Sequence, residues 1–214
     1  ARSRSNFSTA VGVVIVSYNA STAVRVTLAS LRKARNTTSM KVILVDNASD
    51  VLERQAIRSA MEAHISEVGP SWRYIEQEKN LGFSGGNNIG ISEFMNDQEI
   101  SHICLLNSDV IVTDHWVDRL LASNSDIVSA VTNKADSEQC IPVDYQLDIA
   151  ECLDGASDAI QAKAYQRISE FAGRWYEAWR GNLVEADPTF FCVLLSVKAC
   201  SDIGLLDENF FPGG

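Results

Sequence analysis

The chain has 214 residues, of which 46% are hydrophobic and 21% are charged, a composition typical of one soluble globular domain and not of a disordered segment. Acidic residues outnumber basic ones by 28 to 18, and the formal net charge of -10 argues against nucleic acid as a partner and against broad adsorption to anionic lipid. An anionic diphosphate ligand would meet the same repulsion, which a bound divalent cation would offset locally.

The first 131 residues are predicted to contain five strands. The apolar, β-branched run Val11–Ser17 is typical of a strand that is covered on both faces, as in a parallel sheet. Further strands are predicted at Val42–Val45, Trp72–Gln77, His102–Leu106 and Ile127–Val131. The start of the chain, Ala1–Ala10, is polar and lacks a signal-peptide core, and no apolar run reaches the roughly 18 residues of a membrane span.

Helices are predicted between these strands. The first follows Tyr18–Ser21, whose Asn and Ser side chains can cap a helix. The second ends near Ser66, the third is a short helix after a glycine-rich loop at Asn80–Gly86, and Asp114 is predicted to cap the fourth. Strands that alternate with helices indicate βαβ units and an α/β fold with a mostly parallel sheet.

Polar residues follow three of the predicted strands, at Ser17–Asn19, Asp46–Asp50 and Asn107–Asp109. Right-handed crossovers bring the carboxyl ends of parallel strands to one edge of the sheet, and ligands of such sheets bind outside that edge. The sequence therefore predicts a ligand site there.

The alternation stops between residues 133 and 187. Asp154–Arg180 has helical spacing, and Trp175, Tyr176 and Trp179 lie close together within it. These aromatic side chains could stack on a ligand that offers an apolar face, such as a sugar ring, or pack against the rest of the domain. The apolar run Thr189–Ser196 then returns to a strand-like pattern. We expect a single domain over residues 1–214, with a helical insert at about 133–187 packed on the sheet.

The five cysteines are interpreted as reduced thiols. Their number is odd, no CxxC pair occurs, and two of them lie inside apolar strand-like runs. This pattern favours a reducing compartment over a disulfide framework or a zinc site. They are Cys104, Cys140, Cys152, Cys192 and Cys200.

Several well-known site motifs are absent or out of context. No GxGxxG follows the first strand, and there is no GxxxxGK[ST] phosphate loop. Gly82–Gly86 matches the GxSxG nucleophile elbow, but the strand before it ends several residues early and no hydrolase-like arrangement of acid and His follows. These glycines are better interpreted as positions where the backbone approaches a ligand or a strand closely.

Asp46 and Asp109 each end a predicted strand. Either could be an ordinary turn residue. Alternatively, Asp46 could accept a hydrogen bond from a base or ribose, and Asp109 could ligate Mg²⁺ or Mn²⁺, which prefer oxygen ligands and share them with phosphates. Their common sheet edge favours the functional interpretation.

Five segments, in order along the chain, resemble the motifs of family 2 glycosyltransferases, most closely the rhamnosyltransferase-like branch. The resemblance implies a GT-A-type three-layer sandwich and covers nearly the whole chain apart from the insert. Each motif is weak alone, and their order and spacing make the set specific. The segments are Val14–Asn19, Val45–Asp50, Asn80–Asn88, Leu105–Asp109 and Gly204–Phe211.

The resemblance implies a nucleotide site. Ser17 and Tyr18 would line the base and ribose pocket, and Asp46 would accept a hydrogen bond from N3–H of uracil or thymine. The glycine-rich loop would pass close to the nucleotide. The residues expected to contact the nucleotide are Ser17, Tyr18, Asn19, Asp46, Asn47, Gly82, Phe83, Asn87 and Asn107.

The resemblance also implies a metal. Asp109 corresponds to the last acid of the family's DxD motif and would hold Mg²⁺ or Mn²⁺ against the diphosphate, while Asn107 replaces the first acid with a neutral oxygen donor. The implied reaction is inverting transfer of a sugar from a UDP- or dTDP-sugar to a hydroxyl of a saccharide or lipid-linked saccharide, in the synthesis of cell-surface or extracellular polysaccharide. The implied location is the cytoplasm, with peripheral association at the inner face of the membrane.

The family's general base usually follows the stretch that Gly204–Phe211 matches, so the base is expected beyond Gly214 and the chain is expected to be truncated and to transfer sugar poorly. Asp207 and Glu208 match the stretch before that base. Two alternatives remain: a non-catalytic sugar-nucleotide-binding module, and a sugar-1-phosphate nucleotidyltransferase. The second would need a basic, glycine-rich loop after the first strand, and Tyr18–Thr22 is neither.

Overall fold

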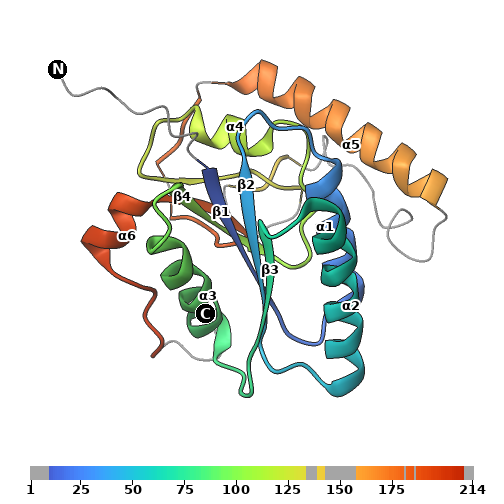
Figure 1. Cartoon of the computed structure of the whole chain (residues 1–214). Coiled ribbons are helices and arrows are strands. Elements are labelled where there is room, and N and C mark those ends of the chain that lie inside the picture. Colours follow the sequence, from blue (N-terminus) through green and yellow to red (C-terminus); the bar gives the residue numbers. More distant parts are fainter. Residues whose placement is uncertain (1–9, 134–138, 143–157, 181, 186, 210–214) are drawn as a thin grey trace.

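A computed structural model describes residues 10–133, 139–142, 158–180, 182–185 and 187–209 of the chain (Figure 1). Its centre is a six-stranded sheet in the order β3-β2-β1-β4-β6-β5. Strands β1 to β4 are mutually parallel, and β6 runs antiparallel to both β4 and β5. The predicted mostly parallel sheet is confirmed. The strands are β1 (Ala10–Ser17), β2 (Met40–Asp46), β3 (Trp72–Glu76), β4 (Ile100–Asn107), β5 (Ile127–Ser129) and β6 (Cys192–Ser196).

Helices cover both faces of the sheet and complete three layers. One face packs against the first, second and fourth helices, and the other packs against the third and sixth. Within the described parts of the chain, none of the helices is long and apolar enough to cross a membrane. The helices are α1 (Ser21–Lys33), α2 (Val51–Val68), α3 (Gly82–Met95), α4 (Trp116–Leu121), α5 (Asp158–Trp179) and α6 (Val197–Ile203).

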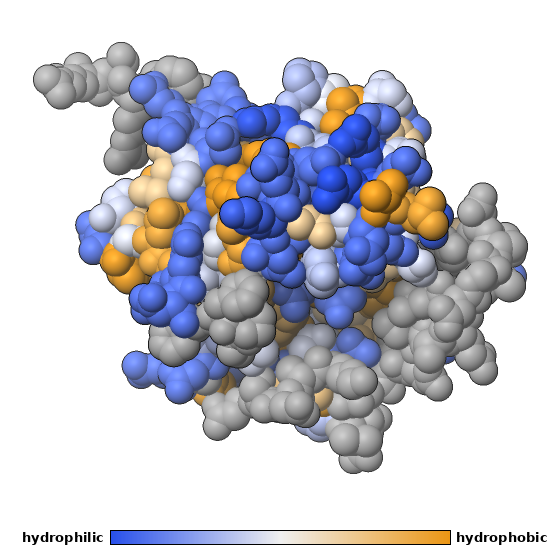
Figure 2. Space-filling model, turned by 90° about the horizontal axis from the view of Figure 1, so that it is seen from below, coloured by the Kyte–Doolittle hydropathy of each residue, from blue (hydrophilic) through white to orange (hydrophobic). Residues whose placement is uncertain are grey.

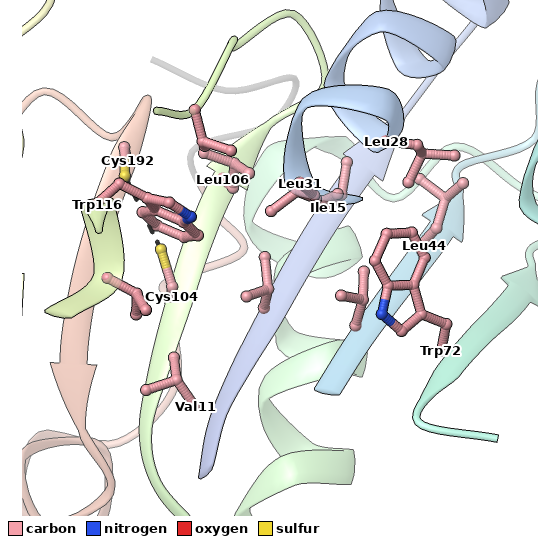
Figure 3. Packing of buried hydrophobic residues seen from close by; sticks show 14 of the residues in the cluster. Val11, Ile15, Leu28, Leu31, Leu44, Trp72, Cys104, Leu106, Trp116 and Cys192 are labelled. Atoms are coloured by element: carbon pink, nitrogen blue, oxygen red, sulfur yellow. Dashed lines mark hydrogen bonds between the residues drawn. The ribbon is translucent and has the colours of Figure 1, made fainter. Parts of the chain in front are cut away.

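Strand β1 is buried on both faces because successive side chains alternate between two hydrophobic clusters. Val11, Val13 and Ile15 belong to the cluster under α1, α2 and α4, whereas Val14 belongs to the cluster under α3 and α6. Figure 3 shows the first cluster, which extends from Trp116 beside β6 to Trp72 on β3. This double burial explains the continuous apolar run in the sequence.

Helix α3 differs from its prediction, because it begins at Gly82 and the expected glycine-rich loop is its first turn. The glycines are needed for close packing on β1. A Cβ at Gly86 would lie 2.7 Å from Val16 Cγ1, and one at Gly90 would lie 2.4 Å from Val14 Cγ1. The cost of glycine in a helix is therefore outweighed by contact with the central strand.

Asp114 was wrongly predicted as a helix cap. The residue before α4 is His115, whose side chain makes no capping hydrogen bond. Asp114 instead accepts hydrogen bonds from the backbone N–H of Arg35 at 3.0 Å and from its Nε at 2.9 Å. The carboxylate thereby connects the end of α1 to the start of α4.

Helix α5 lies beside α4. Tyr165 donates a hydrogen bond to Asp114 at 3.4 Å, and the guanidinium of Arg119 lies 4.8 Å from the ring centroid of Tyr176. Trp175 stacks on Trp179 with ring centroids 5.5 Å apart. In Figure 1 this helix crosses the upper part of the molecule, whereas β2 and β3 end at the lower side. The predicted residues 154–157 of this helix lie outside the described residues.

Cys104, Cys192 and Cys200 are buried free thiols, Cys140 is half-buried, and Cys152 lies outside the described residues. Cys104 Sγ and Cys192 Sγ lie 3.9 Å apart on neighbouring strands (Figure 3). The contact with Cys192, followed by burial, raises the pKa of the Cys104 thiol well above its usual value. A buried, protonated thiol is unreactive, so this pair belongs to the core.

Candidate functional site at the carboxyl ends of the parallel strands

The polar ends of β1, β2 and β4 lie side by side, as the sequence predicted. Ser17 is the register partner of Asp46, and Val16 is the register partner of Asn107. Figure 2 views the molecule from below, toward the edge at which β2 and β3 end, and hydrophilic residues cover much of that face. The fold therefore gathers the motif residues at one sheet edge.

Asp46 is fully buried in this structure. Its Oδ1 accepts a hydrogen bond from the backbone N–H of Ser49 at 2.8 Å, and its Oδ2 accepts one from the Tyr74 hydroxyl at 2.9 Å. Burial, followed by the hydrogen bond to Asp46, raises the pKa of Tyr74 well above its usual value. Asp46 thus closes the turn after β2, and a base could reach it only if neighbouring groups moved.

Asn47 joins the end of β2 to the start of α3. Its Nδ2 donates to Asn80 Oδ1 at 2.9 Å and to the Gly82 carbonyl at 3.0 Å, and its Oδ1 accepts from the Leu81 N–H at 2.9 Å. Both amide hydrogens are used within the protein, and the side chain is buried. In this structure Asn47 holds Gly82, whose φ of 70° is readily adopted by glycine, at the beginning of the helix.

The turn after β1 contains one exposed aromatic side chain, Tyr18, of which 52% is accessible. Asn19 next to it accepts a hydrogen bond from the Asp50 N–H at 2.7 Å and donates its own N–H to Ser49 Oγ at 2.9 Å. The hydroxyl of Ser17 is buried and has no hydrogen-bond partner among the described residues. The turn is therefore tied to the one after β2 and presents Tyr18 to solvent.

Two further predicted residues lie on the first turns of α3. Phe83 is half-buried and meets Phe190 edge-on, with ring centroids 6.2 Å apart. Asn87 is buried, and its Nδ2 donates to the Phe83 carbonyl at 2.9 Å. The helix therefore brings Phe83 close to the segment that precedes β6.

Asp109 is the exposed acid of the site. Within the described ranges, its carboxylate makes no hydrogen bond or ion pair, and no group of three His, Cys, Asp or Glu side chains could hold a metal ion. One free carboxylate, with the half-buried amide of Asn107 nearby in sequence, fits a cation whose remaining ligands come from water and a diphosphate. The residues present are thus compatible with such a metal.

The backbone around Asp109 is held from two directions. The Asn107 N–H donates to the Phe191 carbonyl at 2.8 Å, before β6. On the other side, Thr27 and Ser30 of α1 bond to Ser108 and Val112. These two hydroxyls were not predicted as functional, because their only signal in the sequence was polarity on the inner face of a predicted helix.

Two open hollows lie elsewhere, along the edge strand β3. Arg58, Trp72 and Tyr74 line the first, and Lys41, Glu93 and Phe94 are among the residues that line the second. Neither is lined by Ser17, Asp46 or Asp109. The candidate site therefore lies at the strand ends, where the motif residues gather, and not in either hollow.

The fold is similar to that of solved glycosyltransferases. The mannosyltransferase PcManGT from Pyrobaculum calidifontis, in complex with GDP-Man and Mn²⁺, has a TM-score of 0.55 and 14% identity, over 93% of this chain and 48% of that one. S. aureus TarS 1–349 in complex with UDP-GlcNAc has a TM-score of 0.46 and 17% identity, over 61% of this chain and 37% of that one. The chain thus spans about half the length of PcManGT.

No curated protein sequence matches the chain. The model of the family named Glycosyl transferase family 2 matches residues 12–138, a stretch that contains four of the five motif segments and all the predicted nucleotide and metal residues. The chain therefore belongs to glycosyl transferase family 2.

Proposed function

We propose that the chain binds the nucleoside diphosphate of a UDP- or dTDP-sugar at the carboxyl ends of β1, β2 and β4, for transfer of the sugar to a hydroxyl of a saccharide acceptor. Membership of the family supports glycosyl transfer. The observation that carries the proposed site is Asp109, an exposed carboxylate without a partner among the described residues, on a loop beside the buried polar ends of β1 and β2.

Asp109, with Asn107 beside it, would hold a Mg²⁺ or Mn²⁺ ion. When bound, such an ion would offset the charge of the diphosphate on an acidic protein and stabilise it as a leaving group. The solved structure of PcManGT, which has a similar fold, is a complex with GDP-Man and Mn²⁺, and this supports the proposal of a divalent cation. The carboxylate is available for this role because it is exposed.

The base and ribose would lie against Tyr18 and Ser17, with Asp46 beneath them. Tyr18 is exposed and can pack against an aromatic base. Asp46 can accept from N3–H once Tyr74 or the turn at Ser49 moves and uncovers the carboxylate. Each carboxylate oxygen has two acceptor positions, so it can accept this additional bond.

The transfer step breaks the bond between the anomeric carbon and the phosphate oxygen while the acceptor oxygen forms a new bond to that carbon. The nucleoside diphosphate leaves with the electron pair, and a general base takes the acceptor proton. We expect inversion at the anomeric carbon. We assign no base among the described residues, since the exposed Asp207 and Glu208 belong to the segment that packs on α3.

We further propose that the acceptor is a saccharide or lipid-linked saccharide of a cell-surface or extracellular polysaccharide. The corresponding location is the cytoplasmic side of a membrane. These proposals rest on the order of the sequence motifs.

Calorimetric titration with UDP, dTDP and GDP, each with and without Mn²⁺, tests the donor site. Binding of UDP or dTDP that requires Mn²⁺ and disappears in Asp109→Ala supports the proposal. Asp46→Asn is the second variant: its Oδ1 can still accept from Ser49, but its Nδ2 replaces the oxygen that accepts from Tyr74 and cannot accept from a uracil or thymine N3–H. We expect weaker binding of UDP and dTDP to that variant. Binding of GDP alone would contradict the choice of base, and binding of none of the three by a folded chain would contradict the site.

A further inference from the structure

Two hydroxyl side chains occupy the inner face of α1, where apolar residues are expected. Thr27 is fully buried, and Ser30 is 3% exposed. Their neighbours on the same face, Val24, Leu28 and Leu31, belong to the main hydrophobic cluster. A buried hydroxyl without a partner destabilises the folded state, so these two side chains call for an explanation.

Both hydroxyls are engaged with the loop that carries Asp109. Thr27 Oγ1 donates to the Ser108 carbonyl at 2.7 Å. Ser30 Oγ accepts from the Val112 N–H at 3.1 Å and donates to the Thr27 carbonyl at 2.8 Å. The contact between Thr27 and Ser108 joins residues 81 positions apart, and the contact between Ser30 and Val112 joins residues 82 positions apart. Both connect a regular helix to an irregular segment.

The two contacts lie on either side of Asp109, one residue before it and three residues after it. A third contact, from the Asn107 N–H to the Phe191 carbonyl, holds the end of β4. The carboxylate itself is exposed and bonds to nothing among the described residues. The Asp109 side chain therefore makes no bond among the described residues, whereas the backbone around it is held by three hydrogen bonds.

We propose that Thr27 and Ser30 are positioning residues for Asp109, which fix the loop from Ser108 to Val112 so that the carboxylate is preorganised to bind a divalent cation together with a nucleoside diphosphate. This inference rests on the proposed function, because it requires that Asp109 meets the cation. The residues that orient a metal ligand typically change metal affinity by about 10- to 100-fold when they are removed.

The key variant is Thr27→Val, which keeps the branched shape and removes the hydroxyl, with Thr27→Ser as the conservative variant that keeps it. Ser30→Ala removes the second contact. Ser196→Ala is the matched control: its buried Oγ accepts from the Ala199 N–H at 2.9 Å at the start of α6, away from Asp109. It removes a hydroxyl of the same kind and should destabilise the fold by a similar mechanism.

The first measurement is the affinity for Mn²⁺ at saturating UDP or dTDP, from the electron paramagnetic resonance signal of free Mn²⁺. We expect Thr27→Val and Ser30→Ala to weaken Mn²⁺ binding by about 10-fold, and Thr27→Ser and Ser196→Ala to leave it near that of the unaltered chain. The second measurement needs no ligand: amide hydrogen exchange at Val112 should accelerate in Ser30→Ala and not in Ser196→Ala.

The outcomes separate the two proposals. If Asp109→Ala abolishes Mn²⁺ binding but Thr27→Val and Ser30→Ala bind it as Ser196→Ala does, the positioning role is wrong and the donor site stands. If the unaltered chain binds no Mn²⁺ with either nucleotide, or binds it equally well after Asp109→Ala, the donor site is wrong and the positioning role falls with it. Unchanged exchange at Val112 in Ser30→Ala would overturn the loop contact on its own.

Discussion

Asn88 and Leu206 pair through two reciprocal hydrogen bonds. Asn88 Nδ2 donates to the Leu206 carbonyl at 2.9 Å, and the Leu206 N–H donates to Asn88 Oδ1 at 2.9 Å. The second amide hydrogen of Asn88 goes to Glu208 Oε1 at 2.8 Å. The Asn88 amide thus pairs with the Leu206 backbone in the way that a peptide group of a neighbouring strand would. It joins the glycine-rich motif on α3 to the segment after α6. Two of the motifs that resemble the family form one structural unit.

We expect Asn88→Ala to release the segment from Gly204 to Asn209. Because the amide is buried and all three of its hydrogen bonds are lost, the free energy of unfolding should fall by about 1–3 kcal/mol. Urea unfolding measures that loss, and faster amide exchange at Leu206 would locate it. Asn96→Ala at the C-cap of the same helix is the control, since within the described part of the chain its exposed amide bonds only to the Ser92 carbonyl. Equal effects of the two substitutions would contradict the role of Asn88.

Gly90→Ala should destabilise the fold, because the new Cβ would lie 2.4 Å from Val14 Cγ1 in the central strand. Overpacking of this kind costs about 1–3 kcal/mol. Gly173→Ala on α5 is the control: the nearest atom to its Cβ, Arg119 Nη2, would be 3.8 Å away, so helix propensity should stabilise it by about 0.5–1 kcal/mol. Thermal unfolding of both variants tests the prediction, and a stable Gly90→Ala protein would mean that α3 is free to move away from β1.

The sequence predicted the sheet well because its strands are buried on both faces and leave a continuous apolar run, as in β1 and β2. The start of α3 was predicted wrongly, because glycine disfavours a helix locally. Only the close packing of Gly86 on Val16 and of Gly90 on Val14 explains why glycines lie in this helix. Local propensity was overruled by packing.

The places of the candidate site residues in the fold were predicted better than their contacts. Strand ends could be located from the alternation of elements, so Asp46 and Asp109 were expected at one sheet edge, where the structure has the ends of β2 and β4 on either side of β1. The side chains that build the edge were missed, because their partners are distant in sequence: Thr27 with Ser108, and Asn88 with Leu206. A hydroxyl or amide shows no such partner until the fold is known.

His64 should lower the free energy of unfolding in mild acid. His64 lies 5.4 Å from the Trp72 ring centroid, and burial, followed by the charge of Arg32, lowers its pKa. The folded state therefore favours neutral imidazole: its contribution is complete above the unfolded pKa of about 6.5 and is lost as the pH falls toward the lowered folded value. The urea midpoint should drop between pH 7.5 and 5.5.

The variant His64→Phe, which keeps a ring beside Trp72, should reduce that drop. A residual slope is expected, because burial also lowers the pKa of His102. The double variant with His102→Phe should be nearly flat over the same range. A drop that persists in full in the double variant would assign the acid sensitivity to other groups.

Asp118 connects the loop before β2 to α4, and its carboxylate should contribute to stability. It accepts hydrogen bonds from the backbone N–H of Thr37 at 2.8 Å and of Thr38 at 3.0 Å, and from both hydroxyls at 2.9 and 2.7 Å. Burial opposes ionisation, but these bonds together outweigh it and lower the pKa of Asp118. Asp118→Asn should cost about 1–3 kcal/mol at pH 7, since the bonds to one oxygen become neutral ones and the amide nitrogen that replaces the other oxygen cannot accept.

The pH dependence of that loss distinguishes charge from shape. A carboxylate with a depressed folded pKa stabilises the protein above its unfolded pKa of about 3.9, and the contribution disappears as the pH falls toward the folded value. The difference in urea midpoint between the unaltered chain and Asp118→Asn should therefore be constant from pH 7 to 5 and shrink below about pH 4. Asp202→Asn, which breaks an exposed ion pair with Lys198, should show little difference at any of these pH values, because such pairs contribute little. A difference for Asp118→Asn that stays constant into strong acid would mean that the loss comes from altered packing, and that the Thr37 and Thr38 contacts do not depend on the charge.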